Sequence, residues 1–317
     1  MIRKREIPVY LFTGFLESGK TTFIKETLLE GEFEDGARTL YISCEEGMEE
    51  LEQPLLDKNK ITAVEVEDED DLNTIAMKKW EEEHRPQRIL IEFNGTWDLA
   101  DFMENKLPPN WFVVQVITTI DASTYEVYLG NMKMMMLNQF KESDLVVFNR
   151  CEADIDRGKF RRSVKAVNRK AQIIYENADG TVDQNFEEQM PFDTTGPEIE
   201  IVEEDFGLWY IHAMDHPEIY EGKYVTFKGM FYKPKSSKQD LFVPGRFAMT
   251  CCADDIAFIG FVCHGKGIEQ FRQKDWVKVR AQVRIEYCKD YKGKGPVLYA
   301  ESVEPDEPAQ DELVYFT

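Results

Sequence analysis

The sequence predicts an α/β domain with a mostly parallel sheet, followed by a smaller and mainly antiparallel β domain. In the first half, short apolar runs alternate with helical patterns, which is typical of repeated strand-helix units. A glycine-containing loop follows the first of these runs directly. After residue 217 strand patterns follow one another with glycine and lysine turns between them, as in an antiparallel sheet.

Apolar runs locate the strands of the first domain. They are residues 9–12, 38–43, 61–66, 88–92, 111–117, 145–148 and 172–175. The runs at 88–92 and 111–117 are almost continuously apolar, as strands buried on both faces require. Helices are expected over residues 23–29, 72–80, 122–140 and 154–170.

Proline, glycine and acidic residues interrupt the pattern between residues 177 and 217. This composition predicts a connector with one short strand at 199–202. The expected domains are residues 1–178, an acidic connector at 179–217, and residues 218–317. Strands expected in the last domain, which would form a small OB-like barrel, are 224–231, 241–251, 256–263, 276–288 and 297–303.

The negative net charge of the chain disfavours polyanionic partners. The formal net charge is −22, and residues 218–317 carry equal numbers of acidic and basic side chains, so the excess lies before them. Such a field repels nucleic acids and anionic membranes. Lysines alternate with aromatic residues at 223–238, as in a nucleic-acid groove of an OB fold, but a two-faced strand explains this pattern more simply. We therefore expect no nucleic-acid partner.

The chain contains no apolar run long enough to cross a membrane and no signal peptide at its start. These features predict a cytoplasmic protein without direct membrane insertion. Its six cysteines are then expected as thiols or metal ligands, not as a disulfide framework.

Residues 14–22 match the phosphate-binding pattern G-x-x-x-x-G-K-[ST], between a strand and a helix. Glycines let the backbone wrap closely around phosphate, and the helix N-terminus attracts negative charge. Lys20 adds a full positive charge, and the Thr21 hydroxyl is expected to bind Mg²⁺. The residues expected around the phosphates are Gly14, Glu17, Ser18, Gly19, Lys20, Thr21 and Thr22.

Two later strand ends supply further candidates. Glu92 ends a buried strand and could hold Mg²⁺ through water, while the Gly95 N–H could approach the terminal phosphate. Asn149, Arg150 and Glu152 form a variant of the guanine-reading N-K-x-D motif. A carboxylate at the last position can accept both hydrogen bonds that guanine offers and adenine does not.

Together, residues 13–22, 91–95 and 149–152 resemble the CobW branch of GTPases, relatives of the HypB and UreG metal-insertion proteins. The resemblance covers residues 7–176 and implies GTP binding, Mg²⁺ and GTP hydrolysis. It implies catalytic roles for Lys20, Glu92 and Glu45, the last of which stands where the family has an acidic switch residue. The family's C-x-C-C metal-binding loop is replaced here by residues 64–71, an acidic run that reads either as a hard-cation site or, more simply, as a solvated loop.

Residues 245–255 resemble an uncharacterised C-terminal domain of bacterial proteins that are paired with permeases. A tetrahedral Zn²⁺ site is conceivable from Cys251, Cys252, Cys263 and His264. The competing interpretation is that these cysteines are small core residues. Adjacent strand residues point to opposite faces, so Cys251 and Cys252 would need a bulge to share one ion.

These observations predict a Mg²⁺-dependent GTPase switch linked to handling or delivery of a zinc-like metal for a client protein. The alternative is a non-catalytic, nucleotide-gated adaptor that engages a permease or another protein through the second domain. A P-loop kinase is a third possibility, which the motif at residues 149–152 disfavours.

Overall fold

The computed structural model describes residues 5–29, 31, 33, 35–45, 47, 49–183, 190–234, 240–249 and 256–316. The chain divides into two compact units whose segments alternate along the sequence. One unit combines Met1–Arg157 with Lys170–Phe186, and the other combines Gly158–Arg169 with Glu187–Thr317. The boundary therefore differs from the three-part division expected from composition.

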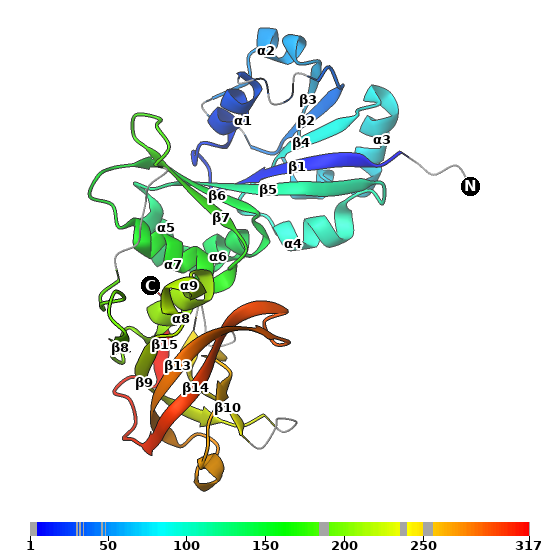
Figure 1. Ribbon diagram of the computed structural model, residues 1–317. Helices are drawn as coiled ribbons and strands as arrows, with labels where there is room; N and C mark the ends of the chain where they lie inside the picture. Colours follow the sequence, from blue (N-terminus) through cyan, green and yellow to red (C-terminus); the bar gives the residue numbers. More distant parts are fainter. Residues whose placement is uncertain are drawn as a thin grey trace. The chain divides into compact units, whose positions relative to one another are not determined.

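A parallel sheet forms the centre of the first unit (Figure 1). Its strand order among the described residues is β3-β2-β4-β1-β5-β6-β7, and every neighbouring pair is parallel. This confirms the predicted α/β domain. The strands are β1 (Ile7–Thr13), β2 (Thr39–Ser43), β3 (Ile61–Glu65), β4 (Arg88–Glu92), β5 (Trp111–Asp121), β6 (Leu145–Cys151) and β7 (Gln172–Asn177).

Helices cover both faces of this sheet, which explains why β4 is buried throughout. Side chains of α1 and α2 join one core and those of α3 and α4 the other. The helices of the unit are α1 (Lys20–Leu29), α2 (Gln53–Lys58), α3 (Thr74–His84), α4 (Leu99–Asp101), α5 (Tyr125–Asn131) and α6 (Lys133–Glu142), with short turns at Glu69–Asp71 and Phe102–Lys106.

The second unit contains a mixed sheet. Its strands are β8 (Glu198–Glu200), β9 (Tyr224–Tyr232), β10 (Leu241–Met249), β11 (Ile256–Gly260), β12 (Cys263–His264), β13 (Trp276–Cys288), β14 (Gly293–Pro305) and β15 (Leu313–Tyr315). Its helices are α7 (Arg157–Val167), α8 (Phe206–Asp215) and α9 (Pro217–Tyr220), with a turn at Ile268–Gln270. Five of the strands form a closed circuit of pairings, because β9 pairs with β10 and β13, while β12 pairs with β10 and β14, and β13 pairs with β14.

Helix α8 lies within the stretch that the sequence suggests is a connector. Phe206, Trp209 and Ile211 are buried in the core of the second unit, and Gly207 lies against Val314 of β15. The helix is apolar on nearly all sides, so it lacks the one-sided periodicity by which a helix is normally recognised. The acidic residues on either side of the helix are typical of a loop, so the sequence predicts a loop there.

In the part of the chain that the structure describes, no helix has the length and apolar character needed to span a lipid bilayer.

Candidate functional site

The loop between β1 and α1 is held in a conformation that requires glycine. Gly14 and Gly19 have φ angles of 140° and 93°, which side chains rarely adopt. A Cβ atom on Gly14 would lie 2.3 Å from the carbonyl oxygen of Thr119 in β5. Lys20 is the first residue of α1 and Gly19 precedes it, so the backbone N–H groups of the loop converge at a helix N-terminus.

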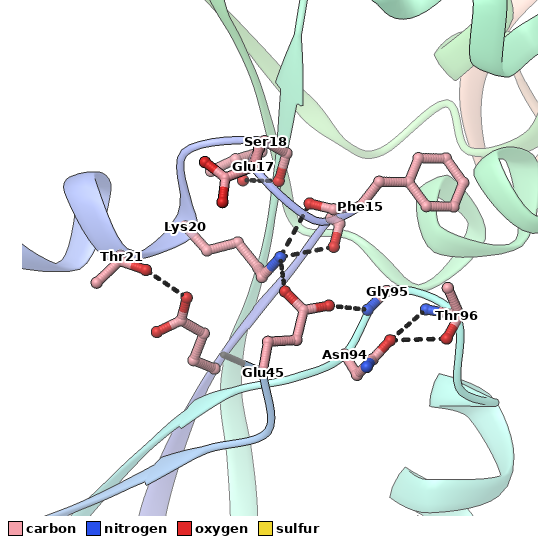
Figure 2. Close-up of polar contacts among 12 residues, drawn as sticks. Phe15, Glu17, Ser18, Lys20, Thr21, Glu45, Asn94, Gly95 and Thr96 are labelled. Carbon is pink, nitrogen blue, oxygen red and sulfur yellow. Dashed lines mark hydrogen bonds and ion pairs between the residues drawn. The ribbon is translucent and has the colours of Figure 1, made fainter. Parts of the chain in front are cut away.

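Lys20 is buried at 3% exposure, and three oxygen atoms surround its ammonium group. Its Nζ donates to the carbonyl oxygens of Gly14 and Phe15, at 2.8 and 3.0 Å. Its third contact is an ion pair of 2.6 Å with Oε2 of Glu45 (Figure 2). Lys20 thus ties the loop after β1 to the segment after β2.

Two oxygen groups meet beside this lysine. The hydroxyl of Thr21 donates to Oε1 of Glu92 at 2.6 Å, and Glu92 is the buried last residue of β4. The hydroxyl of Tyr41 donates to the other Glu92 oxygen. Burial, with the neighbouring Glu92 charge, raises the pKa of Tyr41, so its hydroxyl stays protonated and keeps Glu92 in place.

Cys44 also lies at this edge of the sheet but is not suited to bind a metal as it stands. Its side chain is buried, and burial, followed by the charges of Glu92 and Glu45, raises the pKa of its thiol. Metal ions bind the thiolate, so the protonated thiol is a poor ligand.

The predicted base-reading residues lie at the end of β6. Asn149 is buried, its Nδ2 donates to the carbonyl oxygen of Ser18 at 2.7 Å, and its Oδ1 has no hydrogen-bond partner among the described residues. Arg150 donates to the carbonyl oxygen of Glu17 at 3.0 Å and forms an ion pair with Asp121. Glu152 lies just beyond β6 and is exposed. Asn149 and Arg150 therefore reach the phosphate loop, while Glu152 points a carboxylate toward solvent.

A cavity of about 310 Å³ opens over these groups. Residues that line it come from the phosphate loop, the segment after β2 and the ends of β4 and β6. They include Leu16, Glu17, Gly19, Lys20, Thr21, Thr22, Glu45, Gly47, Glu49, Glu92 and Arg150. Gly95 packs closely against the phosphate loop, since a Cβ atom there would be 2.2 Å from the carbonyl oxygen of Gly14.

The structure describes two of the proposed zinc ligands of the second domain, Cys263 and His264. Cys263 is fully buried in the core of the second unit, and burial raises the pKa of its thiol. The neighbouring His264 is partly exposed, where its Nδ1 lies 3.0 Å from Oδ2 of Asp240. Cys251 and Cys252 lie outside the described residues. Successive strand residues face opposite ways, so Cys263 and His264 do not share a site.

The acidic stretch before α3 is largely exposed and makes hydrogen bonds and an ion pair within the chain. Glu69–Asp71 form a turn, the carboxylate of Asp68 accepts from the backbone N–H of Asp70, and Glu69 pairs with Lys106. Within the described residues, no group of three or more histidine, cysteine, aspartate or glutamate side chains is arranged to hold a metal ion.

Three contacts of the site have no signal in the sequence. Tyr41 reaches Glu92 from the neighbouring strand, Thr119 shares a hydrogen bond of 2.9 Å with Ser18, and Gln139 donates to the carbonyl oxygen of Gly95 at 2.7 Å. These residues lie 51, 101 and 44 positions from their partners. Only the strand order brings them together, and no local motif encodes that order.

Several solved structures are similar to part of this chain. A zinc-bound triple mutant of the YjiA GTPase is 18% identical over 57% of this chain and 60% of its own, with a TM-score of 0.43. Zinc-bound YjiA from E. coli is 15% identical over 74% of this chain and 75% of its own, with a TM-score of 0.42. The hydrogenase maturation factor HypB from Archaeoglobus fulgidus is 15% identical over 55% of this chain and 82% of its own, with a TM-score of 0.38.

This chain thus spans less than two thirds of the first of these neighbours. No curated protein sequence matches it. Family profiles divide it in two: residues 176–316 match the DUF1980 C-terminal domain, and residues 8–175 match the CobW/HypB/UreG nucleotide-binding domain. The second match covers more than half of the chain, and with its phosphate loop this protein belongs to the CobW/HypB/UreG family.

Proposed function

We propose that the protein is a Mg²⁺-dependent GTPase that acts as a nucleotide-controlled switch. The observation that carries this proposal is the convergence of Lys20, Thr21 and Glu92 at one edge of the parallel sheet, beside a glycine-shaped loop. Phosphoryl transfer depends mainly on positioning and on charge neutralisation, which is what this set of residues can supply. Membership of the CobW/HypB/UreG family favours a guanine nucleotide.

Thr21 and Glu92 suit Mg²⁺ because both present hard oxygen atoms, and these lie 2.6 Å apart. Bound there, Mg²⁺ would neutralise charge that develops on the phosphates. Lys20 would bind the β- and γ-phosphates. The Tyr41 hydrogen bond would keep the Glu92 carboxylate directed toward Thr21.

We assign guanine selectivity to the residues at the end of β6 and just beyond it. Asn149 and Arg150 already contact the phosphate loop, which positions the backbone at the start of the base-reading segment. The exposed Glu152 carboxylate would accept hydrogen bonds from guanine N1–H and the 2-amino group. Adenine offers neither donor in that position.

Metal handling is the wider role that the family suggests, with delivery of a zinc-like ion to a client protein. The second unit would provide the contact with that client. The closed circuit of β9, β10, β12, β14 and β13 supports an OB-like barrel, a fold that presents loops for binding. The competing role is a non-catalytic adaptor that engages a permease or another protein.

Hydrolysis by the purified full-length protein separates these two roles. We expect GTP with Mg²⁺ to be converted to GDP and phosphate, and chelation of Mg²⁺ to abolish turnover. Binding of GTP without turnover would favour the adaptor. Elemental analysis of protein purified without chelator, with and without a non-hydrolysable GTP analogue, tests the link to a metal.

A further inference from the structure

The Glu45 carboxylate connects two hydrogen-bond donors that come from different parts of the site. Its Oε2 lies 2.6 Å from Nζ of Lys20, and its Oε1 accepts from the backbone N–H of Gly95 at 3.2 Å. Figure 2 shows Glu45 between these two groups, with the Gly95 loop on the far side from Lys20. The side chain of Glu45 is only 8% exposed and that of Lys20 only 2%.

These contacts use the whole donor capacity of Lys20. An ammonium group has three N–H bonds, and here their partners are Gly14, Phe15 and Glu45. Two of the three are neutral carbonyl oxygens, so Glu45 is the group that compensates the buried charge. A buried ammonium that loses such a partner is strongly destabilised unless another anion replaces it.

The two donors that Glu45 binds are also those that a terminal phosphate would need. In a phosphate loop of this kind the lysine reaches the β- and γ-phosphates. The N–H of Gly95, in the loop that follows β4, donates to the other oxygen of the Glu45 carboxylate. A carboxylate and a phosphate are both anionic acceptors, so they cannot use the same donors at once.

We propose that Glu45 occupies the position of the nucleotide's terminal phosphate and so determines how strongly the site distinguishes a triphosphate from a diphosphate. This inference rests on the proposed function, because it takes the bound ligand to be a guanine nucleotide. A triphosphate displaces Glu45 from Lys20 and Gly95. A diphosphate ends before the Gly95 N–H and leaves that contact in place.

Displacement of Glu45 links ligand binding to a change in the chain. Glu45 lies two residues beyond the end of β2, so its release frees the segment after that strand from the phosphate loop. The free energy of breaking the Glu45 contacts is subtracted from triphosphate binding. The acid therefore acts as an internal competitor and as the sensor of the terminal phosphate.

The test compares Glu45→Gln with a matched control. The glutamine keeps the shape of the side chain but loses its charge, so Lys20 is left for the terminal phosphate. Glu49→Gln removes the same charge from the lining of the same cavity, where Glu49 is exposed. The measured quantities are the dissociation constants of GDP and of a non-hydrolysable GTP analogue, by calorimetry with the full-length proteins.

We expect Glu45→Gln to raise affinity for the triphosphate analogue about tenfold relative to affinity for GDP. The control should leave this ratio within about twofold of the wild type, since exposed charges contribute little. Glu45→Asp, one methylene shorter, cannot span both donors and should give an intermediate ratio. If the glutamine variant does not fold, the affinity ratio of Glu45→Asp still tests the inference.

One outcome would overturn the inference and leave the proposed function intact. In it the wild type binds both nucleotides, and both Glu45 variants show an unchanged or lowered ratio of triphosphate-analogue affinity to GDP affinity. Wild-type protein that binds neither nucleotide would overturn the proposed function itself. An equal rise in the ratio for Glu49→Gln would show a general charge effect and would also refute the specific role of Glu45.

Discussion

The two units use buried polar residues in different ways. In the first unit, Lys20, Glu92 and Asn149 are buried near an open cavity and come from the start of α1 and the ends of β4 and β6. In the second unit, Cys263 and His212 are buried within or beside the apolar core. Parallel strands collect residues at one edge of a sheet, whereas neighbours along a single strand face apart. Variants should therefore impair ligand binding in the first unit and stability in the second.

The largest effect is expected for Lys20→Ala. Removing the ammonium group deletes the phosphate's main charged partner and leaves the buried Glu45 carboxylate unpaired beside it. Affinity for GTP should fall by at least about 100-fold, or about 2.7 kcal/mol. Lys25→Ala, on the same helix but paired loosely with Glu52 at 3.8 Å, is the control and should change affinity less than about twofold. Equal losses in both variants would contradict the role of Lys20 as the phosphate's main charged partner.

Next in size is a pH effect in the second unit. Burial, then the nearby His216 and Arg161 charges, lowers the pKa of His212 to about 4, from an ordinary 6.5. The unfolded chain therefore binds a proton between pH 6.5 and pH 4 that the folded chain does not, and stability falls as the pH is lowered through this range. The loss should be about 2 to 3 kcal/mol greater in the wild type than in His212→Gln.

Urea unfolding followed by tryptophan fluorescence at pH 7 and pH 4 measures this difference, because Trp209 lies in the same core. His84→Gln, in a helix of the first unit, serves as the control and should keep the wild-type dependence. An equal fall in the free energy of unfolding between pH 7 and pH 4 for the wild type and His212→Gln would contradict the expected role of His212.

A smaller loss is expected for Cys263→Ser. The hydroxyl would be placed in a fully buried apolar position, which should lower the free energy of unfolding by about 1 to 3 kcal/mol. Zinc content and GTP affinity should not change, because Cys263 faces the core. A clear drop in bound zinc would show that this cysteine is a ligand after all.

Tyr41→Phe should have the smallest effect. Loss of its hydroxyl releases one Glu92 oxygen and should raise the Mg²⁺ concentration for half-maximal hydrolysis about tenfold. Nucleotide affinity measured without Mg²⁺ should stay the same, which a general loss of structure would not allow. An unchanged Mg²⁺ dependence would mean that Tyr41 does not position Glu92.

The sequence predicts the first unit well because its signals are local. Apolar runs mark the strands, and the spacing of the glycines before Lys20 indicates a phosphate-binding loop. What it could not reveal depends on strand order, which puts Tyr41 beside Glu92 and Glu45 against Lys20. In the second unit, the parallel pairing of β12 with β14 joins strands that are far apart in the sequence, so no local pattern predicts it. Helix α8 is mostly apolar, so it lacks the alternation of apolar and polar faces by which an amphipathic helix is recognised.

The most direct test of the account is competition at the nucleotide site of the full-length protein. A fluorescent GDP analogue is bound in the presence of Mg²⁺ and displaced by GTP or by ATP, in the wild type and in Glu152→Ala. The account predicts displacement by GTP at concentrations at least about 100-fold lower than by ATP, with this preference lost in the variant. Equal displacement by both nucleotides in the wild type would contradict it.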